Sequence, residues 1–263
     1  MLRQRIITAV IALPVLIAAI WFGKSWFTLF IAIAAILSSL EFYRLASHSK
    51  TQPMTYFGVV WTLLFVLSPH CPSNVTTPLL ITSAIVIPLI WLLFRSSKDQ
   101  AFNNWAWTIA GILYIGMLFS YWIAIRGLES GREWVLCGIL IVCVNDISAF
   151  FTGRAWGKHS LAPSISPAKT WEGAIGGLLG SIIGSFIVII AFSLPLNYWQ
   201  IALLGFTISV LAQLGDLVES LLKRNTGTKD SGKLMPGHGG ILDRADSILF
   251  SGFAIYYTAL LIT

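Results

Sequence analysis

The sequence predicts an all-α, polytopic integral membrane protein, on the evidence of its apolar content, its scarcity of charge and its long uncharged segments. Residues of the AVILMFWYC set make up 56% of the 263 residues, charged residues make up 11%, and the mean hydropathy is +0.80. A soluble chain carries about 25% charged residues, so this chain lacks the charge to cover a water-facing surface. The formal net charge of +6 is therefore interpreted as membrane topology, and no nucleic-acid partner is expected.

The uncharged segments set the number of helices. There are 44 uncharged residues between Lys50 and Arg95 and 43 between Glu172 and Asp216, so each segment is long enough for two membrane helices. Polar and Pro-containing stretches at 68–74 and 195–197 separate the helices of each pair. The whole pattern predicts about nine transmembrane helices, at 6–22, 26–43, 54–67, 79–94, 105–125, 134–151, 173–193, 199–222 and 248–262.

The distribution of Lys and Arg predicts a cytoplasmic N-terminus. With that orientation, all of the 17 basic residues lie in cytoplasmic segments except Lys24, Arg126 and Arg132. This bias follows the positive-inside rule. Arg3 and Arg5 before an apolar run would also suit a secretory signal peptide. No clear small-residue cleavage site precedes the next helix, so a retained first helix is favoured.

The polar residues divide the chain into two regions. Residues 1–133 are predicted to be a scaffold of about five helices, where Glu41 and Arg44, spaced i, i+3 at a helix end, are interpreted as a solvated surface pair. Residues 134–263 are predicted to be the catalytic region, with cytoplasmic loops at 152–172 and 223–247. Seven of the eleven acidic residues fall in this second region: Asp146, Glu172, Asp216, Glu219, Asp230, Asp243 and Asp246.

Helical spacing brings the polar residues of 213–223 onto one face. Gln213, Asp216, Ser220 and Lys223 follow a helical repeat, with Glu219 beside them. A carboxylate at the end of an apolar helix is costly in lipid, so Asp216 must face protein, water or a metal.

The start of the last predicted helix repeats this pattern after a Gly-rich segment. Asp243 and Asp246 are spaced i, i+3 there. If Asp216 and Glu219 on one helix and Asp243 and Asp246 on the other face one cavity, their carboxylate oxygens would form a ligand site for Mg²⁺. Nearby cations and glycine N–H groups suit phosphate, namely Lys223, Arg224, Lys229, Lys233, Arg244, Gly237, Gly239 and Gly240.

Each of these residues also has a purely structural interpretation. Asp243 would suit the start of any helix, and Lys223 and Arg224 would serve as topological anchors. Glu219 and Asp230 could be salt-bridge partners, and His238 could be a structural hydrogen-bonding residue as readily as a catalytic one. For the whole run from Asp216 to Asp246, a Mg²⁺–polyphosphate site is the favoured interpretation, because acids beside membrane helices are rare.

Three blocks of the sequence stand out: Asn145-Asp146, the run Ser166-Pro167-Ala168-Lys169-Thr170-Trp171-Glu172-Gly173, and the run from Ser220 to Asp246. They resemble blocks of the phosphatidate cytidylyltransferase, or CDP-diacylglycerol synthase, family. The similarity covers 145–247, and the helices before it match only as generic membrane helices. The chain departs from the family pattern at Ala168, where Lys is common, and at Met235 and Ala245, which replace other aliphatic or aromatic residues.

The resemblance implies a nucleotidyltransferase reaction, CTP + phosphatidate → CDP-diacylglycerol + pyrophosphate, in phospholipid biosynthesis. It implies Mg²⁺, with a second cation as an option, and a bacterial inner membrane with the active site facing the cytoplasm. A homodimer is also implied, although the glycines of 173–184 would equally serve packing within one chain. Asp216 and Asp243 are expected as leading metal ligands, with Asp246 and Asp146 as further ligands. Catalytic roles are expected for Asp216, Asp243, Asp246, Lys223 and Arg244, and phosphate binding for Lys223, Arg224, Lys229, Lys169, His238, Gly239 and Gly240.

Two alternative functions remain open from the sequence. A CTP-dependent polyprenol or phytol kinase would transfer the γ-phosphate of CTP to an alcohol and release CDP. An ion-coupled secondary transporter would use Asp146 and Asp216 as ion sites near the membrane midplane. The clustering of acids at one face beside a basic loop disfavours transport.

Overall fold

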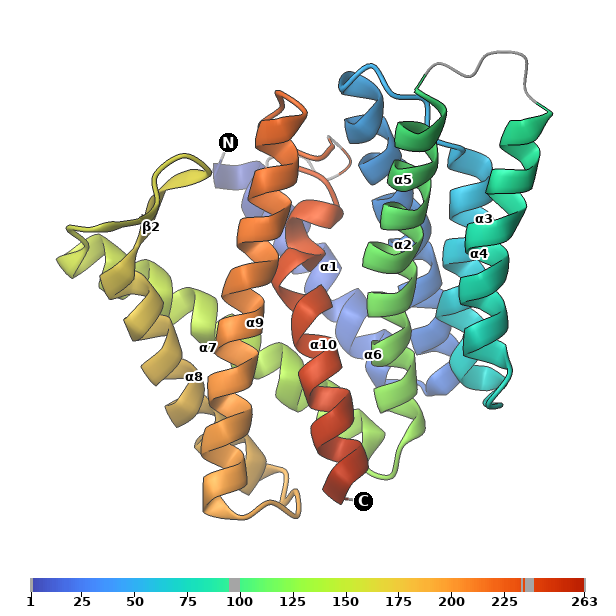
Figure 1. The fold of residues 1–263 in the computed structure, drawn as a ribbon. Coiled ribbons are helices and arrows are strands. Elements are labelled where there is room, and N and C mark those ends of the chain that lie inside the picture. Colours follow the sequence, from blue (N-terminus) through green and yellow to red (C-terminus); the bar gives the residue numbers. More distant parts are fainter. Residues whose placement is uncertain (1, 95–99, 233, 235–238, 263) are drawn as a thin grey trace. The chain divides into compact units, whose positions relative to one another are not determined.

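In the computed structural model of this protein, which describes residues 2–94, 100–232, 234 and 239–262, the chain is helical apart from one small β-hairpin (Figure 1). The elements are α1 (Leu2–Trp21), α2 (Lys24–His48), α3 (Thr55–Leu67) with the 3₁₀ turn η1 (Ser68–His70), α4 (Thr76–Leu93), α5 (Ala101–Gly111), the π-helical η2 (Ile112–Met117), α6 (Leu118–Gly127), α7 (Gly131–Trp156), β1 (Ser160–Ala162), β2 (Ser166–Thr170), α8 (Trp171–Ala191), α9 (Tyr198–Asn225) and α10 (Leu242–Ile262).

The predicted helices all have counterparts in the structure, which confirms the all-α class. Within the described residues, seven helices are long and apolar enough to cross a membrane, counting Ala101–Gly127 as one, and Thr55–His70 is a shorter apolar helix. The protein is therefore a multi-pass membrane protein. The orientation of its N-terminus stays a prediction.

The β-hairpin is a feature that the sequence did not predict. The segment 152–172, expected to be a loop, contains the last turn of α7 and the antiparallel strands β1 and β2, which pair Ser160 with Thr170 and Ala162 with Ser166. Strand β2 runs directly into α8 (Figure 1). The hairpin therefore gives a fixed backbone to part of the second similarity block.

The chain divides into two compact units. The first unit comprises Met1–Ala124 and Lys223–Arg244, and the second comprises Ile125–Leu222 and Ala245–Thr263. The segment before α10 thus belongs to the same unit as the N-terminal helices. The predicted functional division into 1–133 and 134–263 stays a prediction.

The first unit has an aromatic-rich core around α2, α3 and α5. The buried Tyr43 hydroxyl donates a hydrogen bond to the carbonyl oxygen of Thr108 over 2.9 Å. Gly58 and Gly111 give this ring its space, because a Cβ at either position would overlap the phenol. Phe65, Ala84 and Ile112 form a further buried cluster.

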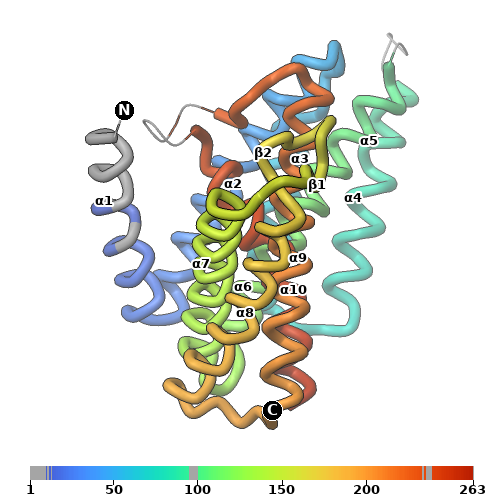
Figure 2. The backbone as a smooth tube through the Cα atoms, turned by 90° about the vertical axis from the view of Figure 1, so that its left-hand side faces the viewer, coloured from blue at the N-terminus to red at the C-terminus, as the bar shows by residue number. Residues whose placement is uncertain are grey.

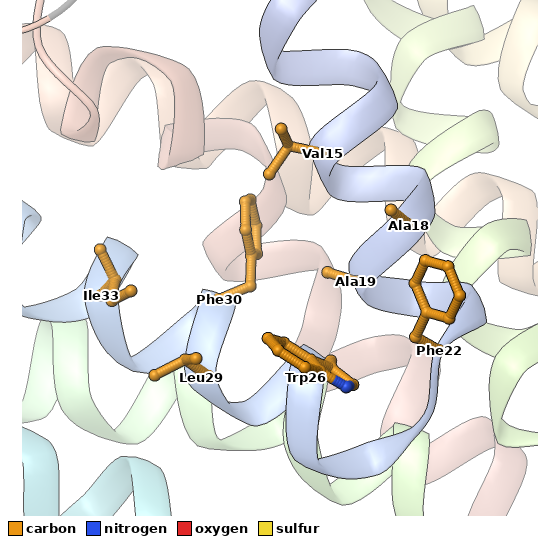
Figure 3. Close-up of a pocket in the computed structure, with 8 residues that line it drawn as sticks. All are labelled: Val15, Ala18, Ala19, Phe22, Trp26, Leu29, Phe30 and Ile33. Carbon is orange, nitrogen blue, oxygen red and sulfur yellow. The ribbon is translucent and has the colours of Figure 1, made fainter.

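An apolar pocket of about 480 Å³ lies between α1 and α2 of the first unit (Figure 3). Its lining side chains are almost wholly hydrocarbon. None of the candidate phosphate or metal residues lines it, so this pocket does not match the predicted polyphosphate site. It is lined by Val15, Ala18, Ala19, Phe22, Trp26, Leu29, Phe30 and Ile33.

In the second unit, α7 and α8 pack side by side through the glycines of α8 (Figure 2). A Cβ on Gly177 would lie 2.9 Å from Oδ1 of Asn145, and one on Gly184 would lie 3.1 Å from Val144. The small residues let the two helices approach closely. The prediction that these glycines serve close helix packing is confirmed.

Candidate active site

In the second unit, the hairpin places a lysine against an acid of α9. Lys169 Nζ lies 2.6 Å from Oδ2 of Asp216, and the two side chains are 25% and 37% exposed. Both residues were predicted to be in the site, Lys169 as a phosphate contact and Asp216 as a metal ligand. The ion pair is therefore only partly buried.

Local hydrogen bonds hold Lys169 at the end of β2. The next residue, Thr170, caps α8 by accepting a hydrogen bond from the Gly173 amide at 3.1 Å. His159 and Glu172 join the two ends of the hairpin through a contact of 2.6 Å between Nδ1 and Oε1. A capped helix and a paired strand thus position the lysine.

Asn145 on α7 is the centre of a buried polar network that reaches Asp146. Its Oδ1 accepts a hydrogen bond of 2.7 Å from Ser209 Oγ and longer contacts of 3.4 Å from Ser181 and Gln213. Its Nδ2 donates to Asp146 Oδ1 over 2.9 Å. Asn145 was only part of a similarity block in the sequence, and its role as a link between α7, α8 and α9 could not be predicted.

Asp146, Lys169 and Asp216 lie close enough to interact electrostatically. The second unit therefore brings two of the predicted metal ligands and one predicted phosphate contact into one neighbourhood. The remaining predicted ligand of this unit, Asp246, lies on α10 and accepts a hydrogen bond from the Ser247 amide. Gly215 allows α9 to approach α10 there, because a Cβ at Gly215 would meet the Asp246 carbonyl oxygen at 2.5 Å.

In the first unit, Lys223 and Asp243 form an ion pair of 2.7 Å in which the side chains are only 15% and 7% exposed. The second carboxylate oxygen of Asp243 accepts hydrogen bonds from the amides of Gly240 at 2.7 Å and Ser231 at 3.0 Å. Gly239, with a φ of 88°, adopts a left-handed conformation that suits glycine. The Asp243 carboxylate therefore connects the backbone at Ser231 and at Gly240 to the first turn of α10.

The interpretation of Glu41 as a solvated surface residue is wrong. Glu41 is 3% exposed and accepts hydrogen bonds from Ser231, Ile241 and Leu242, while Arg44 is exposed. The spacing of Glu41 and Arg44 indicated a local pair, whereas the true partners are distant in sequence. The available signal was an acid placed among apolar residues, which is costly unless it is satisfied.

The remaining candidate residues differ in their exposure, and some lie outside the described part of the chain. Arg224, Lys229 and Arg244 are exposed. Glu219 is fully buried, whereas Asp230 is exposed. Lys233, Gly237 and His238 lie outside the described residues.

The chemistry of the candidate carboxylates can be compared with what Mg²⁺ requires. Within the described residues, no three His, Cys, Asp or Glu side chains gather into a potential metal site. Mg²⁺ usually keeps several waters and takes one or two carboxylates plus substrate phosphates. The neighbouring carboxylates of Asp146 and Asp216 match that smaller requirement.

Comparisons with known proteins agree on one family. A sequence model described as "Cytidylyltransferase family" matches residues 3–262. The chain is 34% identical to a protein named phosphatidate cytidylyltransferase from Staphylococcus haemolyticus, with 95% of each chain covered. It is 33% identical to one of the same name from Bacillus subtilis, with 97% of each covered. A third, from Brucella abortus, is 34% identical over 97% of this chain and 92% of that protein.

Proposed function

Because the chain belongs to the cytidylyltransferase family, we propose that it transfers the cytidylyl group of CTP to phosphatidate, giving CDP-diacylglycerol and pyrophosphate. The observation that carries this proposal is the similarity to phosphatidate cytidylyltransferases over almost the whole chain, not only over the motif-rich region. The membrane helices supply the setting that a diacyl lipid substrate requires.

The chemistry asks for charge neutralisation rather than for a strong base. The phosphate of phosphatidate is already an anionic nucleophile, and it attacks the α-phosphorus of CTP while the bond to pyrophosphate breaks. The site must bring two polyanions together and stabilise the charge that develops on the leaving group. The proposed phosphate contact of the second unit is Lys169. Those of the first unit are Lys223, Arg224 and Arg244.

Mg²⁺ is the proposed cofactor, and it would stabilise negative charge on the phosphate oxygens when bound. Asp146 and Asp216 would hold it in the second unit, with Asp246 as a further ligand. Asp243, which belongs to the first unit, is proposed as a metal ligand on the sequence pattern alone. Lys169 and Lys223 currently contact two of these acids. In this proposal the ammonium groups turn to the phosphates as the substrates bind.

The proposed setting is a bacterial inner membrane with the site facing the cytoplasm. The supporting observation is the sequence bias of Lys and Arg toward the predicted cytoplasmic segments. The homodimer stays a prediction, since the glycines of α8 are used against α7 of the same chain.

The test is an assay of purified protein with CTP, Mg²⁺ and phosphatidate. The expected products are CDP-diacylglycerol and pyrophosphate. Release of CDP and phosphorylation of an added lipid alcohol would instead identify a kinase, and uptake into liposomes driven by an ion gradient would identify a transporter. Either outcome without nucleotidyl transfer would refute the proposal.

A matched pair of variants tests the role of Asp216. Asp216→Asn should lower turnover by about 100-fold or more, the scale expected when a group that stabilises developing charge is lost. Glu129→Gln makes the same acid-to-amide change at an exposed position between α6 and α7 and should retain wild-type turnover. Near-normal Mg²⁺-dependent turnover in Asp216→Asn would remove its role as a metal ligand.

A further inference from the structure

Glu41 on α2 contacts a segment that lies far along the chain, at the entry to α10. Its Oε1 accepts a hydrogen bond from the Ile241 amide at 3.1 Å, and its Oε2 accepts from the Leu242 amide at 2.9 Å. The hydroxyl of Ser231, 190 positions away in sequence, donates to Oε2 at 3.2 Å. All of these residues belong to the first unit.

These hydrogen bonds satisfy both the Glu41 carboxylate and the first amides of α10. The first amides of a helix have no acceptor within the helix, and the helix N-terminus favours negative charge. A buried carboxylate in turn requires hydrogen-bond donors. Glu41 therefore supplies from α2 the cap that the start of α10 needs, and the start of α10 supplies the donors that make a buried Glu41 tolerable.

Two described glycines before α10 leave room for this carboxylate. A Cβ added to Gly232 would lie 2.8 Å from the Glu41 Cδ atom, and one added to Gly240 would lie 2.6 Å from it. Real Cβ atoms do not approach a fixed carboxylate so closely, so a side chain at either position would displace Glu41. Two glycines of the similarity block thus have a structural reason that involves an N-terminal helix.

Glu41 shares its partners with Asp243. Ser231 donates its hydroxyl hydrogen to Glu41 and its amide hydrogen to Asp243. The Gly240 amide donates a hydrogen bond to Asp243, and the next amide, of Ile241, donates one to Glu41. Asp243 also pairs with Lys223. A shift of Glu41 would therefore move the donors that orient Asp243 and, through Asp243, Lys223.

We propose that Glu41 is a positioning residue for the reaction: it fixes Ser231 and the first turn of α10 so that Asp243 and Lys223 keep a productive geometry. The expected effect of Glu41 on kcat rests on the proposed function. Its expected effect on the structure around the start of α10 rests on the hydrogen bonds alone. It extends the functional part of the chain into α2, which the sequence assigned to the scaffold.

Glu41→Gln is the direct test, because it keeps the size of the side chain and turns one acceptor oxygen into a donor that faces other donors. Hydrogen exchange of peptides covering 240–244 should become about tenfold faster or more, while peptides of α8 keep their wild-type rates. The kcat should fall about tenfold or more with a KM for CTP within about threefold, since small misplacement mainly affects the chemical step. Glu129→Gln is the matched control and should change neither readout.

Unchanged exchange at 240–244, or exchange raised equally throughout the protein, would overturn the proposal, as would a wild-type kcat despite local loosening. Ser231→Ala is the milder second variant if Glu41→Gln does not fold. It removes only the hydroxyl donor and should cause a smaller rise in exchange and a smaller loss of kcat, and wild-type values for both would also overturn the proposal. If the wild-type protein makes no CDP-diacylglycerol, the proposed function fails, while the exchange experiment still tests the role of Glu41.

Discussion

Lys169 Nζ forms an ion pair with Asp216 Oδ2 at 2.6 Å. A residue predicted to bind phosphate therefore contacts a residue predicted to bind metal. The predicted phosphate contact and the predicted metal ligand thus interact with each other in the absence of a ligand. A cation that approaches Asp216 meets competition from the ammonium group, and a phosphate that draws Lys169 away leaves the carboxylate more open to a cation. Binding of nucleotide and Mg²⁺ should for this reason be mutually favourable.

Replacing Lys169 should separate these two effects. In Lys169→Gln, the loss of a charged phosphate contact should lower kcat/KM by about 10- to 100-fold, from the roughly 1.5–3 kcal/mol of such a hydrogen bond. The concentration of Mg²⁺ for half-maximal activity should fall, by at most about fivefold, because exposed ion pairs contribute about 1 kcal/mol or less. Titrations of initial rate against CTP and against Mg²⁺ measure both.

Lys50→Gln, at an exposed position outside the candidate site, is the control for Lys169→Gln. It should leave both titrations unchanged. An increase in the Mg²⁺ requirement of Lys169→Gln would contradict competition between the ammonium group and the cation.

Asn145 should be more important to stability than its small size suggests. Asn145→Leu leaves Ser209 and Gln213 without their shared acceptor, and it removes the donor to Asp146. Leaving buried polar groups unsatisfied costs about 1–3 kcal/mol, and hydrogen bonds between membrane helices average about 0.6 kcal/mol each, so a loss of about 1–2 kcal/mol is expected. Thermal unfolding in detergent measures it.

Ser181→Ala provides the comparison for Asn145→Leu, because Ser181 makes only a long contact of 3.4 Å with the same Oδ1 atom. Its midpoint of unfolding should shift less than that of Asn145→Leu. Equal midpoints would show that Asn145 is not the centre of the network.

Much of the fold could be predicted from the sequence, because long apolar runs have few structural solutions in a membrane. The helix that carries Asp216 and the helix that begins near Asp243 were both predicted. The hairpin around Lys169 was not, since strands of three and five residues interrupted by Pro167 lack an alternating apolar pattern.

The partners of polar residues were less predictable than their helices. Helical spacing placed Asp216 and Lys223 correctly on one helix, yet their ion-pair partners are Lys169 and Asp243. Glu41 shows the limit most clearly, because its hydrogen bonds join residues 190 or more positions apart. Periodicity reports neighbours along one helix, and contacts between helices need the fold.

The pair of Lys223 and Asp243 should behave as one energetic unit. Both side chains are largely buried, so removing either partner leaves a charge in a poorly solvated place, at a cost of about 3–5 kcal/mol. The double variant Lys223→Gln/Asp243→Asn should lose less stability than the sum of the single variants, by about 1 kcal/mol or more. Unfolding midpoints of the four proteins complete the cycle.

The distant pair Lys50→Gln and Glu129→Gln is the control cycle, since these exposed residues have no place in the Lys223–Asp243 contact. Their effects should add. Additive losses for Lys223 and Asp243 as well would show that the ion pair contributes no coupling.

Gly205 on α9 should be intolerant even of alanine. A Cβ there would lie 2.8 Å from the Ile182 Cα atom and 2.9 Å from the Ser181 carbonyl oxygen, both in the backbone of α8, which cannot move aside as a flexible side chain would. Forcing the helices apart should cost about 1–3 kcal/mol, despite the better helix propensity of alanine. Gly127→Ala is the matched control, because a Cβ at Gly127 meets no atom within 4 Å. Thermal unfolding in detergent should show a lower midpoint for Gly205→Ala and an unchanged or slightly higher one for Gly127→Ala, and equal midpoints would mean that α8 and α9 have room to separate.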